Sequence, residues 1–112
     1  MALALVSVLS ARRDEPIYEP GNGGSTPILV HTVYAQYTAD AMRRRVEGKV
    51  VLACVVDREG IPQSVTVVKP LDDEIDQVSV RALKRWRFEA GTKAGKPVSV
   101  RIFVEMSFSM KR

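Results

Sequence analysis

The most regular pattern in the chain is an alternation of apolar and polar residues near its C-terminus. After Pro97, apolar side chains occupy every second position: Val98, Val100, Ile102, Val104, Met106, Phe108 and Met110. The residues between them are polar, with Phe103 as the exception. Because successive side chains of a strand point to opposite faces, this pattern predicts one long strand over 97–110 with one face in the core.

An earlier stretch, residues 49–56, carries apolar residues on both of its faces, which is typical of a strand in the middle of a sheet. Residues 57–60 form a turn sequence that ends in glycine, and residues 61–68 return as another strand, so a β-hairpin is predicted. Cys54 shares a face with Leu52. We therefore expect its thiol to be buried, with a raised pKa that disfavours a role as nucleophile.

Two segments show the spacing of amphipathic helices. Thr38 is a good N-cap and Gly48 a good stop signal, which predicts a short helix at about 38–47. The second helix follows the acidic residues 72–74 and has apolar residues at helical spacing: Ile75, Val78, Ala82, Leu83 and Trp86. Acidic residues precede this helix and basic residues end it, so its charges match the helix dipole. We expect Trp86 to pack against the core face of the C-terminal strand.

These elements predict an α+β fold. Their order is helix, strand, strand, helix, strand, and a right-handed crossover places the third strand beside the first. The result is a small three-stranded, antiparallel-rich sheet in the order 2-1-3, with both helices on one face. Pro62, Gln63 and Ser64 blunt the edge formed by the second strand. The outer edge of the third strand lacks such protection, so we expect it to be open for pairing with another extended chain.

The N-terminal part of the chain has a different character. Residues 2–9 form an apolar run, far shorter than the roughly 20 residues that cross a bilayer as a helix. The pattern leaves open whether residues 1–10 are a signal, the remnant of an anchor or a first strand. Residues 12–27 are polar and rich in Gly and Pro, which is the composition of a linker. We therefore expect an N-terminal segment over 1–27 and a folded domain over 28–112.

Composition and charge narrow the class of function. With 112 residues, 46% of them apolar, the chain suffices for one domain with a hydrophobic core. A net charge of +4 and an aromatic content of 6% give little support to nucleic-acid binding. The single cysteine, Cys54, and the single histidine, His31, are too few for a disulfide or a usual zinc site. We expect no catalytic residue, no cofactor and no metal.

Two clusters of charge have structural explanations. Arg43, Arg44 and Arg45 lie near the predicted end of the first helix, where cations interact favourably with the helix dipole; a phosphate-binding patch is the alternative. The acidic residues 72–74 lack the glycine and the distal glutamate of a calcium-binding loop. Capping of the second helix explains them better.

From about residue 27 to residue 112 the chain resembles the C-terminal domain of the TonB family. The resemblance rests on four segments: Gln36-Tyr37 before the first helix, EGKVVLACVVDREG through the hairpin, Ile75-Asp76, and ALKRWRFEAGTKAGKPV before the closing strand. The block Trp86-Arg87-Phe88 with its following glycine and Gly-Lys-Pro turn is specific in this context. Thr38 and Ala90 stand where the family usually has proline.

The resemblance implies a non-catalytic, periplasmic protein-binding domain that transduces inner-membrane energy for uptake. Its partner would be the box peptide of an outer-membrane TonB-dependent transporter, added as a strand along the third strand. The family pattern contributes Gln36 and Tyr37 to the partner-binding set. The open strand contributes the rest of that set: Val100, Arg101, Ile102, Phe103, Val104 and Glu105. Of these, Arg101, Phe103 and Glu105 alternate on the open face and can select the peptide.

The same resemblance implies an inner-membrane tether in a full-length form, with contact to an inner-membrane complex of the ExbB and ExbD type through the anchor. The alternative function is that of a sensory or assembly domain in a membrane-anchored regulator of the peptidase type. The open edge also allows a homodimer through the third strand.

Overall fold

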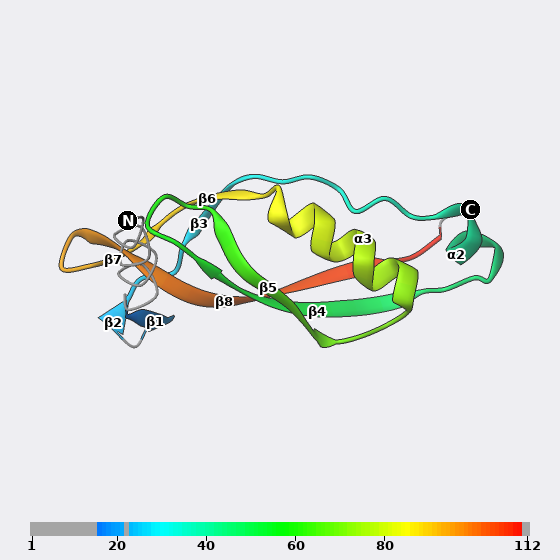
Figure 1. Ribbon diagram of the computed structural model, residues 1–112, viewed down its shortest axis with the longest axis horizontal. Coiled ribbons are helices and arrows are strands. Elements are labelled where there is room, and N and C mark those ends of the chain that lie inside the picture. Colours follow the sequence, from blue (N-terminus) through cyan, green and yellow to red (C-terminus); the bar gives the residue numbers. More distant parts are fainter. Residues whose placement is uncertain (1–15, 22, 111–112) are drawn as a thin grey trace, which may run out of the picture.

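The computed structural model describes residues 16–21 and 23–110. Three long antiparallel strands form the centre of the molecule (Figure 1). β4 (Gly48–Val56) lies between β5 (Pro62–Lys69) and β8 (Lys96–Phe108), and it pairs with β8 along all of its 9 residues. The predicted sheet order 2-1-3 is therefore confirmed for these strands. The segment 1–10, for which three interpretations were open, lies outside the described residues.

β5 forms the far edge of this sheet and carries an irregularity. Ser64 has a φ of 54°, and the register with β4 shifts between Ala53 and Val55. A bulge of this kind interrupts the row of backbone groups that another strand would need. The expectation of a protected edge on this side is confirmed.

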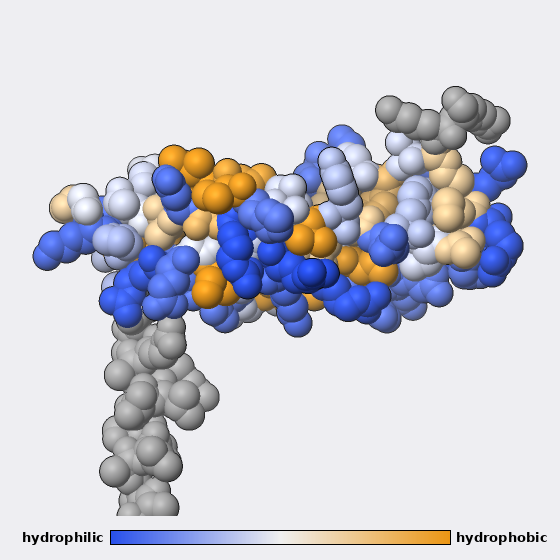
Figure 2. Space-filling view, turned by 90° about the horizontal axis from the view of Figure 1, so that it is seen from above, coloured by the Kyte–Doolittle hydropathy of each residue, from blue (hydrophilic) through white to orange (hydrophobic). Residues whose placement is uncertain are grey.

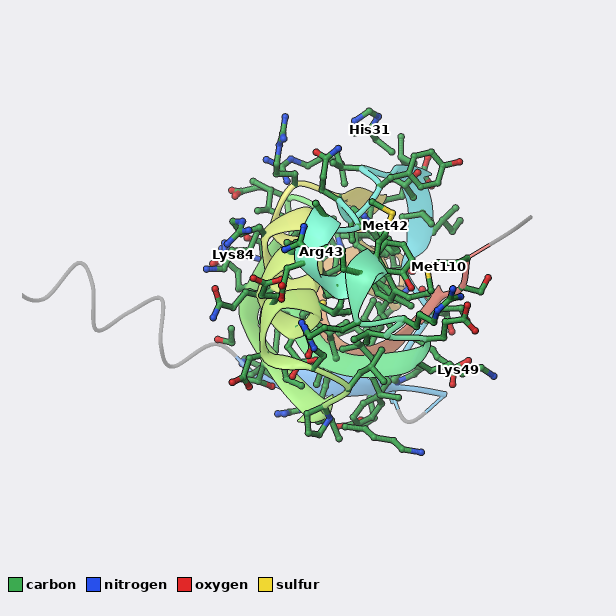
Figure 3. All side chains as sticks on the ribbon, turned by 90° about the vertical axis from the view of Figure 1, so that its right-hand side faces the viewer. His31, Met42, Arg43, Lys49, Lys84 and Met110 are labelled. Carbon is green, nitrogen blue, oxygen red and sulfur yellow. The ribbon has the colours of Figure 1, made fainter. Side chains whose placement is uncertain are left out.

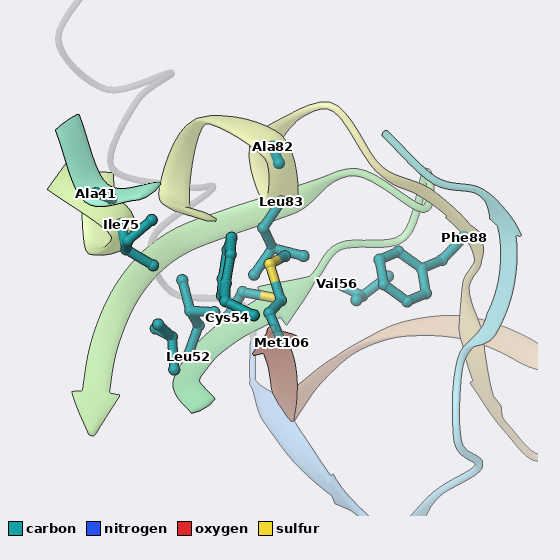
Figure 4. Close-up of a cluster of buried hydrophobic side chains, with 11 residues drawn as sticks. Ala41, Leu52, Cys54, Val56, Ile75, Ala82, Leu83, Phe88 and Met106 are labelled. Carbon is teal, nitrogen blue, oxygen red and sulfur yellow. The ribbon is translucent and has the colours of Figure 1, made fainter. Parts of the chain in front are cut away.

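Both described helices contribute to the core on one side of the sheet. α3 (Asp73–Lys84) lies along one face, and α2 (Ala39–Arg43) sits near the end where β8 finishes (Figure 1). Ala41 of α2 and Ile75 of α3 belong to one buried cluster (Figure 4). Neither helix is long and apolar enough to cross a membrane.

The first helix is shorter than the sequence predicted. It ends at Arg43, and the chain then turns through Arg45, whose φ is 58°. The Val46 N–H donates to the carbonyl of Ala41, and the Arg45 N–H donates to that of Met42, which is the hydrogen-bond pattern of a Schellman turn. The stop signal expected at Gly48 is therefore wrong by several residues, because an arginine adopts the left-handed conformation that usually requires glycine.

The expected linker contains regular structure, which corrects the sequence analysis. β1 (Ile17–Pro20) runs parallel to β8 and pairs with it at two positions, and β2 (Gly23–Gly24) pairs with β1. Tyr18 explains why this segment is ordered: its ring lies against Gly23, its Cβ lies against Gly24, and the Lys93 ammonium lies 4.6 Å from the ring centroid. Glycine here permits close packing rather than flexibility.

Three further short strands lie at the same end of the molecule. β3 (Ile28–His31) and β6 (Arg87–Glu89) form a separate two-stranded sheet, and β7 (Gly91–Lys93) makes a hairpin with the beginning of β8 (Figure 1). These strands are too short to show a periodic pattern in the sequence.

These additions change the prediction that the outer edge of β8 is open along its length. β7 pairs with residues 96–98, and β1 pairs with Ser99 and Val100. From residue 101 to residue 108, no strand among the described residues pairs with this edge. The edge is therefore open only in the C-terminal part of the strand.

The core lies between α3 and the sheet, and Figure 4 shows its main contributors. Leu52, Ile75 and Leu83 are fully buried. Cys54 is 1% exposed in the middle of this cluster, and burial raises the pKa of its thiol to about 11. The prediction of a buried cysteine with a raised pKa on a central strand is confirmed.

Candidate protein-binding site

An extended segment between β3 and α2, residues 32–38, runs along the molecule and is called the strap here. The Trp86 indole N–H, at the end of α3, donates to the carbonyl of Val33 over 2.9 Å. Farther along, the Tyr37 hydroxyl donates to the carbonyl of Val46, and its ring stands edge-on to Phe108 with centroids 5.6 Å apart. Burial raises the pKa of Tyr37, and the charge of Glu47 adds to this effect. Two aromatic side chains thus hold a segment that has no regular hydrogen bonding.

A groove of about 470 Å³ lies between the strap and the end of β8, and we call it the β8 groove. Its walls are residues 32–35 and Tyr37 on one side and residues 105–109 on the other, with Trp86 also in the lining. The open part of the β8 edge, residues 101–108, ends in this groove. An extended peptide placed here would meet unpaired backbone groups on one side and apolar side chains beside them.

Of the residues expected on the open strand, Phe103 is the most available. Its side chain is 62% exposed. Arg101 and Glu105 lie on the same face in exposed ion pairs, Arg101 with Glu19 at 3.3 Å and Glu105 with Lys49 at 3.5 Å. Exposed pairs of this kind contribute little to stability, so both side chains are able to change partner.

The remaining strand residues face inward. Val100 is fully buried, and its backbone pairs with Tyr18 of β1. Ile102 and Val104 are half-buried and pack against the core cluster. At positions 102 and 104, a partner could contact the backbone but not the inward-facing side chain. At Val100, a partner would first have to displace β1.

The structure separates the two residues taken from the family pattern. Tyr37 lines the β8 groove, whereas Gln36 lines a second hollow of about 390 Å³ on the other side of the strap. This second hollow lies against α3, where Arg81 and Arg85 contribute to its lining. The two residues therefore serve different surfaces even though they are neighbours in the chain.

Other residues of the groove were missed in the sequence. Tyr34 is 95% exposed on the strap, and Ser107 and Ser109 continue the open side of β8 beyond the predicted set. The alternation of apolar and polar residues up to Met110 could have extended that set. The role of Trp86 as an anchor of the strap depends on a contact across 53 residues of sequence, which no local pattern reveals.

None of the candidate chemical groups lines the groove. His31 is exposed on β3 (Figure 3), while Cys54 is in the core. Asp72 caps α3 by accepting from the N–H groups of Glu74 and Ile75, which confirms the capping interpretation of the acidic cluster. Within the described ranges, no group of three His, Cys, Asp or Glu side chains is arranged to hold a metal ion.

The three arginines near α2 also have a structural role. Arg44 donates to both carboxylate oxygens of Asp72, at 2.8 and 3.3 Å, and to Asp40 at 2.8 Å, while Arg43 pairs with Asp40. Arg44 therefore links α2 to the first turn of α3. This hydrogen bonding lowers the pKa of Asp72 and of Asp40.

A separate apolar surface lies on β3, before the strap begins. Figure 2 shows hydrophobic side chains gathered toward the end of the molecule that carries β3 and β6. Ile28, Leu29 and Val30 of β3 are all exposed there. None of these three residues lines the β8 groove, so the two surfaces are distinct.

Comparison with known proteins identifies the relatives of this chain. Residues 33–110 match the model of the family described as Gram-negative bacterial TonB protein C-terminal. The chain is 34% identical over 82 residues to Protein tonB2 of Pseudomonas aeruginosa, with 72% of this chain and 30% of that protein covered. It is 30% identical over 76 residues to Protein TonB of Xanthomonas campestris, with 67% of this chain and 34% of that protein covered.

The fold has a counterpart among solved structures. The solution NMR structure of the Pseudomonas aeruginosa TonB CTD aligns with a TM-score of 0.63 and 22% identity, over 79% of this chain and 90% of that one. The chain spans about a third of the length of the curated relatives it matches. The match over 33–110 includes all but the first residue of the strap, together with α3 and all of β8 that borders the groove. The chain therefore belongs to the Gram-negative TonB protein C-terminal family.

Proposed function

We propose that this chain is a periplasmic protein-binding domain that docks the box peptide of an outer-membrane TonB-dependent transporter by strand addition. In this role it transmits force generated at the inner membrane and catalyses no reaction. The observation that carries the proposal is the open backbone edge of residues 101–108, which borders a groove. An extended peptide that pairs with this edge gains main-chain hydrogen bonds, and the groove supplies side-chain contacts.

The position of the edge limits the length of the paired segment. β1 and β7 occupy the edge up to Val100, so a peptide has about eight residues of β8 available unless it displaces β1. Phe103 and the exposed charges of Arg101 and Glu105 lie on one face of that stretch. We infer that they select among peptides, while the backbone provides most of the affinity.

The proposal is tested by titrating a fluorescently labelled box peptide into the protein. Proline lacks an N–H, and adjacent N–H groups of a strand point to opposite edges. Of the two single variants Ile102→Pro and Phe103→Pro, one therefore removes a donor from the outer edge and the other removes a donor from the edge that faces β4. We expect the variant that removes the outward N–H to abolish binding, provided that circular dichroism shows an intact fold. Gln36→Ala should weaken binding by about threefold, as expected for loss of one polar contact.

A matched control separates strand addition from attraction to charge. Arg43→Gln removes a positive charge from the exposed surface of α2, and Arg43 lines neither the β8 groove nor the second hollow. It should leave peptide affinity unchanged. Full affinity in both proline variants, or a loss of affinity in Arg43→Gln alone, would show that the peptide does not use the β8 edge.

A further inference from the structure

The β8 groove and the second hollow lie on either side of the strap and share two of its residues. Val33 and Tyr34 contribute to the lining of both. Val33 is held from below by the Trp86 indole, and the Tyr34 side chain is 95% exposed. A peptide that leaves the groove across Val33 and Tyr34 would therefore stay in contact with the protein until it reaches the second hollow.

The second hollow is positively charged. Arg81 and Arg85 lie one turn apart on α3, and both side chains are exposed. No ion pair between described residues includes either of them. Like charges at positions i and i+4 of a helix repel each other. Two guanidinium groups without acidic partners, beside the Gln36 amide, are complementary to carboxylates.

Glu74, an acidic residue that contacts the strap, is already engaged. Glu74, at the start of α3, accepts a hydrogen bond from the Thr38 hydroxyl over 2.7 Å and lies 3.9 Å from Arg44. Thr38 thus does not offer its hydroxyl to a ligand, and Glu74 is oriented toward α2. No salt bridge between described residues occupies the side chains of Arg81 and Arg85, so they are free to pair with an acidic group of another molecule.

We propose that this basic hollow receives acidic side chains at one end of the peptide that docks on β8. The inference rests on the proposed function and adds to it the class of partner, a peptide whose strand-forming core continues into acidic residues. Backbone pairing tolerates many sequences, so it discriminates weakly between peptides. Arg81 and Arg85 then act as specificity-determining residues, since charge complementarity penalises the wrong partner.

The competing explanation is that these arginines only offset the dipole at the end of α3. Lys84 provides the control, because it stands between them in the sequence and lies in the same last turn. It does not line the hollow, and Figure 3 shows it at the outer surface of the helix. If the dipole alone mattered, Lys84→Gln and Arg85→Gln would behave alike.

The experiment uses the full chain and a box peptide extended by Asp-Asp or Asn-Asn, at its N-terminal or its C-terminal end. We expect Asp-Asp to bind about three- to tenfold more tightly than Asn-Asn at one end only, as two exposed charge pairs allow. The preference should disappear in Arg81→Gln/Arg85→Gln, persist in Lys84→Gln, and fade at about 0.5 M salt. Unchanged urea midpoints would show that each variant folds.

The outcomes separate this inference from the proposed function. If the box peptide binds and moves β8 amides in NMR spectra, but Asp-Asp and Asn-Asn peptides bind equally, only the acidic preference is wrong. Equal loss of the preference in Lys84→Gln also overturns it, since the effect is then general charge. If no box peptide binds, both proposals fall. If only the peptides extended by Asp-Asp bind, and the NMR signals of the β8 amides do not shift, the link between the β8 groove and the second hollow is contradicted.

Discussion

Single side chains hold the strap in place, and Trp86 is the main one. It is half-buried, packs against the edge of the core, lies 6.3 Å from Phe88 between ring centroids, and donates to Val33. It packs against the core cluster that includes Met106 and Phe108 and lines the β8 groove with them, so it lies at the groove rather than deep in the core; direct packing on the core face of β8 stays a prediction. Its removal therefore affects both the stability and the shape of the site.

Trp86→Phe separates these contributions. It keeps most of the apolar contact and loses the N–H donor, so we expect it to lower the free energy of unfolding by about 1 kcal/mol. Trp86→Ala also loses the packing of a partly buried aromatic and should lower it by about 2–4 kcal/mol. Urea denaturation measures both. Equal losses in the two variants would mean that the hydrogen bond to Val33, rather than packing, accounts for the effect.

Gly60 joins the hairpin turn to β6. Its φ is +83°, its carbonyl accepts from the Phe88 N–H over 2.9 Å, and a Cβ atom there would overlap the Phe88 carbonyl oxygen. No other residue fits without moving β6. The sequence indicated a turn that ends in this glycine, but the contact with β6 is visible only in the fold.

Gly60→Ala should therefore lower the free energy of unfolding by more than the positive φ alone would cause. We expect a loss of at least about 2 kcal/mol in unfolding free energy, from backbone strain plus the clash. Gly95 is a matched control, with a φ of +80° and no atom within 4 Å of the place that a Cβ would occupy. Gly95→Ala should lose only about 1 kcal/mol, from the left-handed conformation. Similar losses at both sites would contradict the close approach of Gly60 to β6.

At the scale of elements, α2 and α3 are joined by charge as well as by packing. The Arg44 guanidinium beside Asp72 holds the pKa of that carboxyl below its usual range, and the N–H groups of the first turn of α3 add to this. A carboxyl with a lowered folded-state pKa stabilises the fold above its unfolded pKa of about 3.9. That stabilisation is lost as the pH falls through the folded-state value.

Asp72→Asn tests this link, because asparagine remains a good N-cap but carries no charge. We expect the variant to be less stable than the natural protein at about pH 6, and the difference to shrink as the pH falls below about 4. Urea midpoints across this range measure it. A difference that stays constant down to about pH 2.5 would indicate that the charge of Asp72 does not stabilise the link.

The elements that the sequence predicted well are those in which a periodic pattern repeats over many residues. Alternation over 97–110 located β8, and the helical spacing from Ile75 to Leu83 located α3, because each pattern repeats over several turns or residue pairs. β1, β3 and β6 have at most four residues, too few to show a period. The strap is extended because distant side chains hold it. Hence the open edge was predictable, but the groove beside it and the hollow at Gln36 were not.

At the scale of the whole molecule, the short strands and the strap define where a partner has room. β1 and β7 close the first part of the β8 edge, the bulge at Ser64 interrupts the far edge on β5, and the strap borders the part that stays open. Among the described residues of β8, the stretch 101–108 is the part of the outer edge left for pairing. This arrangement favours a single peptide site at a defined place.

Amide hydrogen exchange along β8, with and without saturating box peptide, tests strand addition most directly. Within 101–108, N–H groups that point to β4 are already paired, while those that point outward have no strand partner among the described residues. We predict that the outward amides become at least about tenfold slower to exchange when peptide is bound, with β5 unchanged. If they keep their free-state rates while peptide is bound, or if the new protection appears on β5, strand addition to β8 is contradicted.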